Sequence, residues 1–309
     1  MIRSILLTAA LCVLLSSCST YTTFYGETVT TTDVDIKTRR LDLSYQNLKE
    51  FPVAVEKLQA LRMLNLSGNT ELDIPAILAS LPYPDKLEVL VLDSLQLKKI
   101  PEAVRDFKNI KQLSLAYNPA LDLEKTIAVI EELPLVFLNL KGNQLTKLPK
   151  EIMHLKALKD LNLSYNELKD ENSYTYLSQM SNLYSLWLDH NTLEILPKTI
   201  GMLSQIRYLY IDHNKLATLP DLSGMKNTWV VHAGHNRFDM VPEQLIGMPG
   251  LFLVHLNNNN IATIPRVYSK EKYTMMALIL DQNPLPEEER LWAEKTFKKF
   301  FLLSFEQSF

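Results

Sequence analysis

The sequence predicts an α/β solenoid, in which a parallel β-sheet lines the concave face and short helices or turns form the convex face. Three observations support this fold class. A short segment recurs along the chain, as in LNLKGNQLTKLP at 138–149 and LYIDHNKLATLP at 209–220. Leucines alternate with other residues at the start of each copy, and an asparagine follows most copies at a fixed distance. Self-similarity of this kind indicates stacked units that share one core.

The copies align on the residue three places after the second strand leucine. Nine of the eleven copies carry asparagine there, and successive copies lie 22 to 26 residues apart. The eleven positions are Gln46, Asn69, Leu95, Asn118, Asn143, Asn166, Asn191, Asn214, Asn236, Asn259 and Asn283. We therefore expect eleven repeats between residues 38 and 285, each with one short parallel strand.

Each repeat begins with a strand whose leucines point into the core. Leu161 and Leu163 are two residues apart, so in a strand they point to the same side, while Asp160, Asn162 and Ser164 point to the other side. One unit alone cannot cover its leucines, whereas stacked units cover those of their neighbours.

The asparagines belong to the sharp turn that follows each strand. This turn leaves main-chain amides and carbonyls buried, and the Asn side chain carries both donors and an acceptor that can pair with them. Proline after the next Leu or Ile, as at Pro149, ends strand pairing and starts the convex return segment. Leu95 holds the asparagine position in the third copy, so its turn must satisfy the main chain in another way.

The lengths of the units predict the structure of the convex segments, and the residue composition at each end of the solenoid predicts its cap. The units beginning at Asn69, Asn118 and Asn166 are longer, and we expect a helical turn or more in each. Residues 286–309 predict a C-terminal capping helix and tail, because Pro286 precedes three glutamates and lysines follow near the helix end. Residues 18–37 are expected to form a tether and an N-terminal cap.

The repeat pattern resembles the leucine-rich-repeat family. The motif LxxLxLxxNxL is carried by Leu158, Leu161, Leu163, Asn166 and Leu168. The LPxxIxxL half, for example at 148–155, looks like the repeats of plant intracellular Ras-group-related proteins. The resemblance covers residues 38 to 285 and implies a horseshoe whose exposed strand positions are available for recognition.

The first 17 residues have the layout of a signal peptide: Arg3, an apolar run, then small residues. Leu15-Ser16-Ser17-Cys18 resembles the lipobox of bacterial lipoproteins, which implies cleavage before Cys18 and lipid attachment to its sulfur. The resemblance also favours the outer membrane, because the residue directly after Cys18 is Ser19 and not the acidic residue that retains some lipoproteins at the inner membrane. A plain secretory leader is the alternative. Since the other cysteine lies within the leader, no disulfide is expected in the mature protein.

Large aromatic residues and histidines occupy exposed strand positions in the later half of the repeats. Rings on a solvated strand face are typical of interfaces, because Trp, Tyr and His combine large contact areas with polar edges. The candidate partner-binding residues are Phe137, Tyr184, Trp187, Tyr208, Tyr210, Trp229, His232, His255, Asp189 and Asp212. The alternative is that these rings stack on one another and only shield the sheet.

Histidines recur at one position of successive units: His190, His213 and His235. Imidazole and carboxylate groups this close could hold zinc, but side chains at equivalent positions run parallel instead of converging. We predict no metal site and no cofactor. Because histidine titrates near neutrality, we do expect partner binding to depend on pH between 5.5 and 8.

Composition and motifs restrict the function. The formal net charge of −3 shows no excess of basic residues of the kind that nucleic-acid binding requires. The sequence contains no GxSxG, P-loop, HExxH or GxGxxG motif, so no enzymatic activity is expected. The leading hypothesis is a non-enzymatic, lipid-anchored recognition scaffold of the bacterial cell envelope that binds a protein or peptide on its concave face. The alternatives are a glycan-binding envelope protein or adhesin, and a purely structural envelope component.

Overall fold

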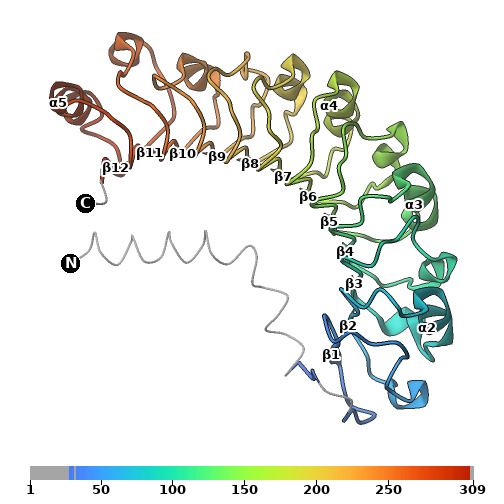
Figure 1. Cartoon of the computed structure of the whole chain (residues 1–309). Helices are drawn as coiled ribbons and strands as arrows, with labels where there is room; N and C mark the ends of the chain where they lie inside the picture. Colours follow the sequence, from blue (N-terminus) through green and yellow to red (C-terminus); the bar gives the residue numbers. More distant parts are fainter. Residues whose placement is uncertain (1–27, 31–32, 307–309) are drawn as a thin grey trace.

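The protein is a curved solenoid with one continuous parallel sheet on its inner face (Figure 1). The computed structural model describes residues 28–30 and 33–306. Twelve strands pair in chain order, each with the next. Their bounds are β1 Arg40–Asp42, β2 Met63–Asn65, β3 Val89–Val91, β4 Gln112–Ser114, β5 Phe137–Asn139, β6 Asp160–Asn162, β7 Ser185–Trp187, β8 Tyr208–Tyr210, β9 Val230–His232, β10 Leu253–His255, β11 Ala277–Ile279 and β12 Leu302–Ser304.

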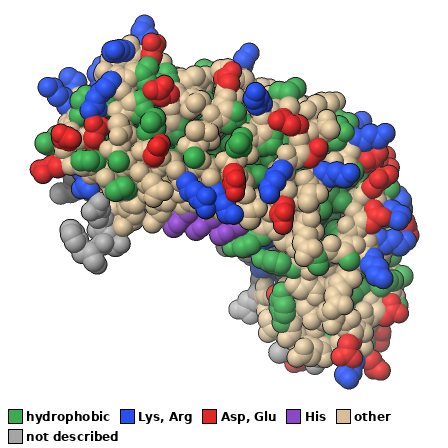
Figure 2. Space-filling view, turned by 45° about the horizontal axis from the view of Figure 1, so that its top comes forward, with side chains coloured by type: hydrophobic (Ala, Val, Ile, Leu, Met, Phe, Trp, Pro, Cys, Tyr) green, Lys and Arg blue, Asp and Glu red, His purple; other side chains and the backbone are tan. Residues whose placement is uncertain are grey.

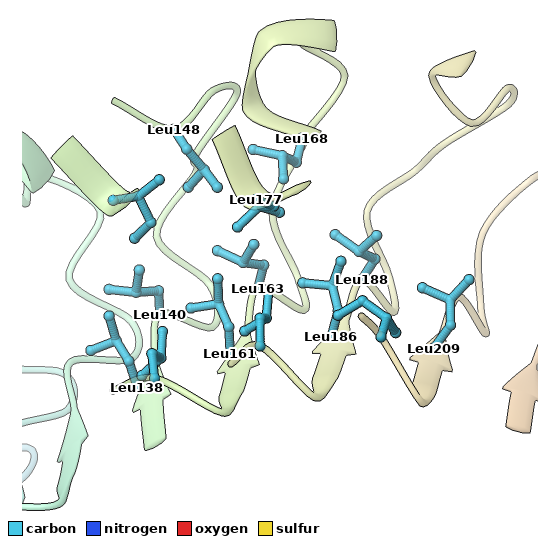
Figure 3. Close-up of a cluster of buried hydrophobic side chains, with 14 of the residues drawn as sticks. Leu138, Leu140, Leu148, Leu161, Leu163, Leu168, Leu177, Leu186, Leu188 and Leu209 are labelled. Atoms are coloured by element: carbon cyan, nitrogen blue, oxygen red, sulfur yellow. The ribbon is translucent and has the colours of Figure 1, made fainter. Parts of the chain in front are cut away.

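The core lies behind the sheet, between the strands and the convex segments. Leu138, Leu161, Leu186 and Leu209 stand at equivalent positions of β5 to β8 and are fully buried. Figure 3 shows these leucines pointing to the convex side, together with Leu140, Leu163 and Leu188. The predicted inward position of the alternate leucines is therefore confirmed.

The turn asparagines form the predicted ladder. Asn166 is typical: its Nδ2 donates to the main-chain oxygens of Leu163 in its own unit and Leu140 in the preceding unit. Its Oδ1 accepts from the main-chain nitrogens of Asn143 and Leu145, also in the preceding unit. The turn at Leu95 is satisfied by the next unit, because Asn118 Oδ1 accepts from the Leu95 nitrogen at 3.0 Å.

The convex face carries an α-helix in each of the three longer units, as predicted. These helices are α2 Ile74–Ser80, α3 Leu123–Ile130 and α4 Glu171–Ser178. Asp73, Asp122 and Asp170 cap their N-termini by accepting a main-chain N–H three residues later. Most other units hold a 3-10 helix: η1 Val55–Lys57, η3 Glu102–Asp106, η4 Lys150–His154, η5 Lys198–Met202, η6 Glu243–Gly247 and η7 Arg266–Ser269. A further 3-10 helix, η2 Pro84–Lys86, follows α2 within the same unit.

The C-terminal end differs from the prediction by one strand. Helix α5 Glu287–Thr296 follows the last asparagine as expected, and Ala293 and the following Phe297 are buried against the core. The tail then returns to the sheet as β12, which pairs with β11. The eleven predicted repeats thus each supply one strand, β1 to β11, and β12 is an additional strand that the sequence did not predict.

At the N-terminal end, Val29 forms an isolated parallel bridge with Leu41 of β1. The predicted signal peptide, Cys18 and most of the tether lie outside the described residues. Among residues 28–30 and 33–306, no helix combines the length and the apolar character needed to cross a membrane.

Candidate binding surface

Four rings of the predicted surface form one stacked column on the concave face, here called the inner column. Trp187, Tyr210, His232 and His255 are Cα partners across β7 to β10. Their ring centroids are 5.1, 4.7 and 4.1 Å apart, with interplanar angles of 5°, 18° and 12°. All four side chains are half-buried. Each ring covers the face of the next, so the column presents mainly ring edges.

A second stack, the turn column, runs beside the first where the strands end. It consists of Tyr165, His190, His213 and His235, with centroids 4.1, 4.3 and 4.0 Å apart. Lys141 places its Nζ 4.5 Å from the centroid of the Tyr165 ring. Figure 2 shows the histidines side by side on the inner side of the arc, next to hydrophobic side chains.

The turn column has a backbone cause that the sequence reasoning missed. Its position adopts a left-handed conformation throughout the solenoid, with φ between 51° and 57° at Tyr165 and the three histidines. Gly68 and Gly142 hold the same position in earlier units. A Cβ added to Gly68 would lie 2.3 Å from the ring of Tyr45, and one at Gly142 would lie 2.4 Å from the ring of Tyr117. Glycine therefore makes room for the ring of the preceding unit.

Asp189 and Asp212 follow β7 and β8 and lie between the two columns, in a shallow hollow of about 420 Å³. Asp189 accepts from Ser164 Oγ and from the Asp212 main-chain nitrogen, both at 3.1 Å. Asp212 accepts from the Gly234 nitrogen at 2.7 Å. Burial raises the pKa of both carboxyl groups, and together with the neighbouring Asp189 carboxylate it raises the pKa of Asp212 to about 7.

Four histidines of the two columns have pKa values below the ordinary value of 6.5. Burial lowers the pKa of His232 to about 3 and that of His255 to about 4. Burial also lowers the pKa of His190 and His235, and the neighbouring histidines of the turn column act in the same direction. His232 and His255 are thus neutral between pH 5.5 and 8, and the expected histidine titration on this surface was wrong for them. Asp212, whose pKa is raised to about 7, does titrate near neutrality.

Asp212→Asn should stabilise the protein at pH 8. The folded chain holds a proton on Asp212 with a pKa of about 7, whereas the ordinary pKa is 3.8. The stability contributed by that proton is complete below about pH 4 and is lost as the pH rises to about 7. The amide can still accept from Gly234 and cannot ionise, and Asn257 already holds the equivalent position two units on.

Chemical unfolding of both proteins at pH 5 and pH 8 measures this effect. We expect the advantage of the variant over wild type to be about 2–3 kcal/mol larger at pH 8 than at pH 5, since about two units of the raised pKa lie in this interval and one unit corresponds to about 1.4 kcal/mol. An equal difference at both pH values would contradict the assignment to Asp212.

The remaining candidate rings lie along one side of the inner column and meet at open angles. Tyr184 and Tyr208 are 5.3 Å apart at 51°, and Tyr208 meets Trp229 at 6.2 Å and 64°. Tyr184 and Trp229 are exposed. Tyr184 and Tyr208 line a groove of about 610 Å³, here called the lateral groove, together with Lys159, Asp160, Arg207 and other residues. Phe137 on β5 meets Trp187 edge-on at 6.4 Å.

The ten candidate residues therefore occupy three adjacent positions: the inner column with Phe137, the aspartates beside the turn column, and the rings near the lateral groove. The histidine rings of the turn column stack face to face with interplanar angles of 8° and 11°, as their equivalent positions suggested. Within the described part of the chain, no group of three or more His, Cys, Asp or Glu side chains is arranged to hold a metal ion. One ring nitrogen, His255 Nε2, is buried without a hydrogen-bond partner among the described residues.

Comparisons with known proteins identify the fold. No family model and no curated protein matches the chain. Among solved structures, an internalin (inlF) of Listeria monocytogenes has 20% identity and a TM-score of 0.57, with 84% of this chain and 79% of that chain covered. The TLR13–ssRNA13 complex has 21% identity and a TM-score of 0.69, with 92% of this chain covered. This chain spans only 42% of the TLR13 chain.

A leucine-rich-repeat protein of Leptospira interrogans has 21% identity and a TM-score of 0.43, with 92% of this chain and all of that chain covered. The internalin and TLR13 are leucine-rich-repeat proteins as well. Together with the twelve-stranded parallel sheet and its asparagine ladder, the likeness to these two structures shows that this protein has the leucine-rich-repeat solenoid fold.

Proposed function

We propose that this protein is a non-enzymatic recognition scaffold, lipid-anchored at the bacterial cell envelope, that binds a protein or peptide on its concave face. The inner column is the observation that carries the proposal. Four half-buried rings lie at consecutive strand positions of an open sheet face, where side chains that served only the fold would not need to be aromatic. The fold is one in which each repeat adds one position to an extended concave surface.

Ring orientation favours a polypeptide as the partner of the inner column. Because Trp187, Tyr210, His232 and His255 cover one another's faces, they offer an incoming molecule ring edges with N–H, O–H and ring-nitrogen groups. A polypeptide supplies the complementary main-chain donors and acceptors at regular intervals.

Glycan binding is favoured only at the lateral groove. Sugar rings stack on free aromatic faces, and the open angles between Tyr184, Tyr208 and Trp229 leave such faces accessible. Arg207 lies with its guanidinium carbon 5.5 Å from the Tyr184 ring centroid and adds donors for hydroxyl groups. Loss of signal from an oligosaccharide array in Tyr184→Ala, with retention in Tyr83→Ala, would support this second function.

Lipid anchoring rests on residues 1–18 alone: the leader and the lipobox-like segment that ends at Cys18. Two or three acyl chains give stable membrane attachment, at roughly 0.8 kcal/mol per buried methylene. Cell fractionation should place the wild-type protein with the membranes and release Cys18→Ala from them. Equal sedimentation of both proteins would contradict the anchor.

Site-specific photo-cross-linking in intact cells tests the proposed partner class. A cross-linking amino acid in place of Tyr210 should trap one or a few defined proteins, whereas the same group in place of Met202 on η5 should not. Met202 is 52% exposed and lies on the convex side, so it controls for accessibility. Defined protein adducts from position 202, or none from position 210, would contradict recognition through the concave face.

A further inference from the structure

The last strand, β12, has a neighbour on one side only among the described residues. Leu302 donates its N–H to Met276, and Ser304 accepts from the Leu280 N–H, so both residues turn their main-chain groups towards the preceding unit. In a parallel pair, the residue between them turns its N–H and C=O the other way. Leu303 therefore presents one donor and one acceptor to the open side.

This edge is apolar as well as unpaired. Phe301 is 43% exposed, and Leu302, Leu303 and Phe305 are only half-buried. A hollow of about 620 Å³ beside β12 is lined by Phe300, Phe301, Leu303 and Phe305 together with residues from the end of α5. Proteins usually shorten, charge or cover such edges, because an open apolar strand pairs readily with another chain. An edge with this composition indicates a surface that another strand covers.

The strand is complementary to itself. In the segment Phe301-Leu302-Leu303-Ser304-Phe305, an antiparallel copy centred on Leu303 places Phe301 opposite Phe305 and Leu302 opposite Ser304. The two Leu303 residues then face each other and can exchange both N–H···O=C bonds. Aromatic pairs across strands stabilise such pairing.

The charges near the strand fit the same arrangement. Pairing centred on Leu303 places Glu306 of one copy opposite Phe300 of the other, beside Lys299. Both Lys299 and Glu306 are exposed, and neither forms an ion pair within the described part of its own chain. The two-fold arrangement brings these opposite charges together twice.

We propose that two copies of this protein associate end to end through antiparallel pairing of β12 about a two-fold axis at Leu303. The sheet then continues from one solenoid into the other, and the two concave faces belong to one assembly. This association is independent of the proposed partner binding, since the inner column lies on β7 to β10. Two linked binding faces on one membrane give a bivalent receptor, whose avidity for a repetitive partner exceeds the affinity of each face.

Two variants of the full chain test the arrangement. In a hydrogen-bonded antiparallel pair the Cα atoms are about 5.5 Å apart, within the range for a disulfide. Leu303→Cys should therefore form a disulfide-linked dimer under mild oxidation, while wild type, with its own cysteines, and Met202→Cys should not. Leu303→Pro should abolish the dimer that the wild-type chain forms in sedimentation equilibrium. Since the Leu303 N–H points away from β11, proline there removes no bond to β11.

The unfolding midpoint of Leu303→Pro shows whether the variant remains folded. If it does not, Leu302→Lys provides the same test, because two added lysines close together at the shared edge should prevent pairing. A wild-type chain that sediments as a monomer at every concentration overturns the proposal. So does a Leu303→Cys chain that cross-links no more than Met202→Cys.

Discussion

Asn118→Ala should lower the free energy of unfolding by about 3–5 kcal/mol, which is among the largest effects of a single substitution. The Asn118 side chain is fully buried. Its Nδ2 donates to the main-chain oxygens of Leu92, Leu115 and Ala116 at 3.0, 3.0 and 3.1 Å. Alanine would leave these carbonyls without that donor, and an unsatisfied buried polar group costs about 1–3 kcal/mol.

The acceptor side of Asn118 adds to this cost. Its Oδ1 accepts from the main-chain nitrogens of Leu95 and Leu97, both at 3.0 Å. Leu95 occupies the ladder position of that unit, so no amide side chain stands there to compensate. Asn109→Ala is the matched control, because Asn109 is exposed and donates one bond to Asp85. Denaturant unfolding followed by circular dichroism should show a loss below about 1 kcal/mol for the control, and equal losses would contradict the role of the ladder.

The second large effect concerns binding. Replacing Trp187 and Tyr210 together by alanine should weaken partner affinity at least about 30-fold, because central aromatic hot spots are each worth about 2 kcal/mol or more. The two rings stack in the inner column with parallel planes. The fold should survive, since the leucines beside them in β7 and β8, Leu186 and Leu209, remain in the core. Tyr83→Ala with Met202→Ala removes two exposed side chains outside the concave face and is the matched control.

Repeat periodicity predicted most of the fold because each strand leucine and each turn asparagine has one structural task. The three longer units form α-helices because their additional residues allow a full helical turn. The sequence also contains the N-cap residues of these helices, Asp73, Asp122 and Asp170, which would have located the helix starts. The sequence did not predict β12 because its unit lacks the turn asparagine. Ser308 holds the position at which most earlier units carry asparagine.

The sequence predicted which strand positions the candidate residues occupy, but not how their rings are oriented. Strand register follows from the repeat, so the sequence could bring Trp187, Tyr210, His232 and His255 into one column. The angles between rings depend on packing around each side chain, and they decide which groups a partner can reach. The pKa values depend on burial in the same way, which is why near-neutral titration was wrongly expected of His232 and His255.

The turn column could have been extended from sequence. Tyr45, Tyr117 and Tyr165 directly precede the ladder position of their units, as the three histidines do. Glycine occurs at this position only in the units that follow Tyr45 and Tyr117. Reading this position as one column would have revealed rings along most of the solenoid edge.

The affinity of the partner trapped from position 210 tests the central claim most directly. With the purified partner, isothermal titration calorimetry should give a measurable Kd for the wild-type protein and for Tyr83→Ala with Met202→Ala. For Trp187→Ala with Tyr210→Ala, the account predicts binding that is at least about 30-fold weaker, while the unfolding midpoint stays near that of wild type. A double variant that remains folded and binds with the wild-type Kd would show that the inner column is not the recognition surface.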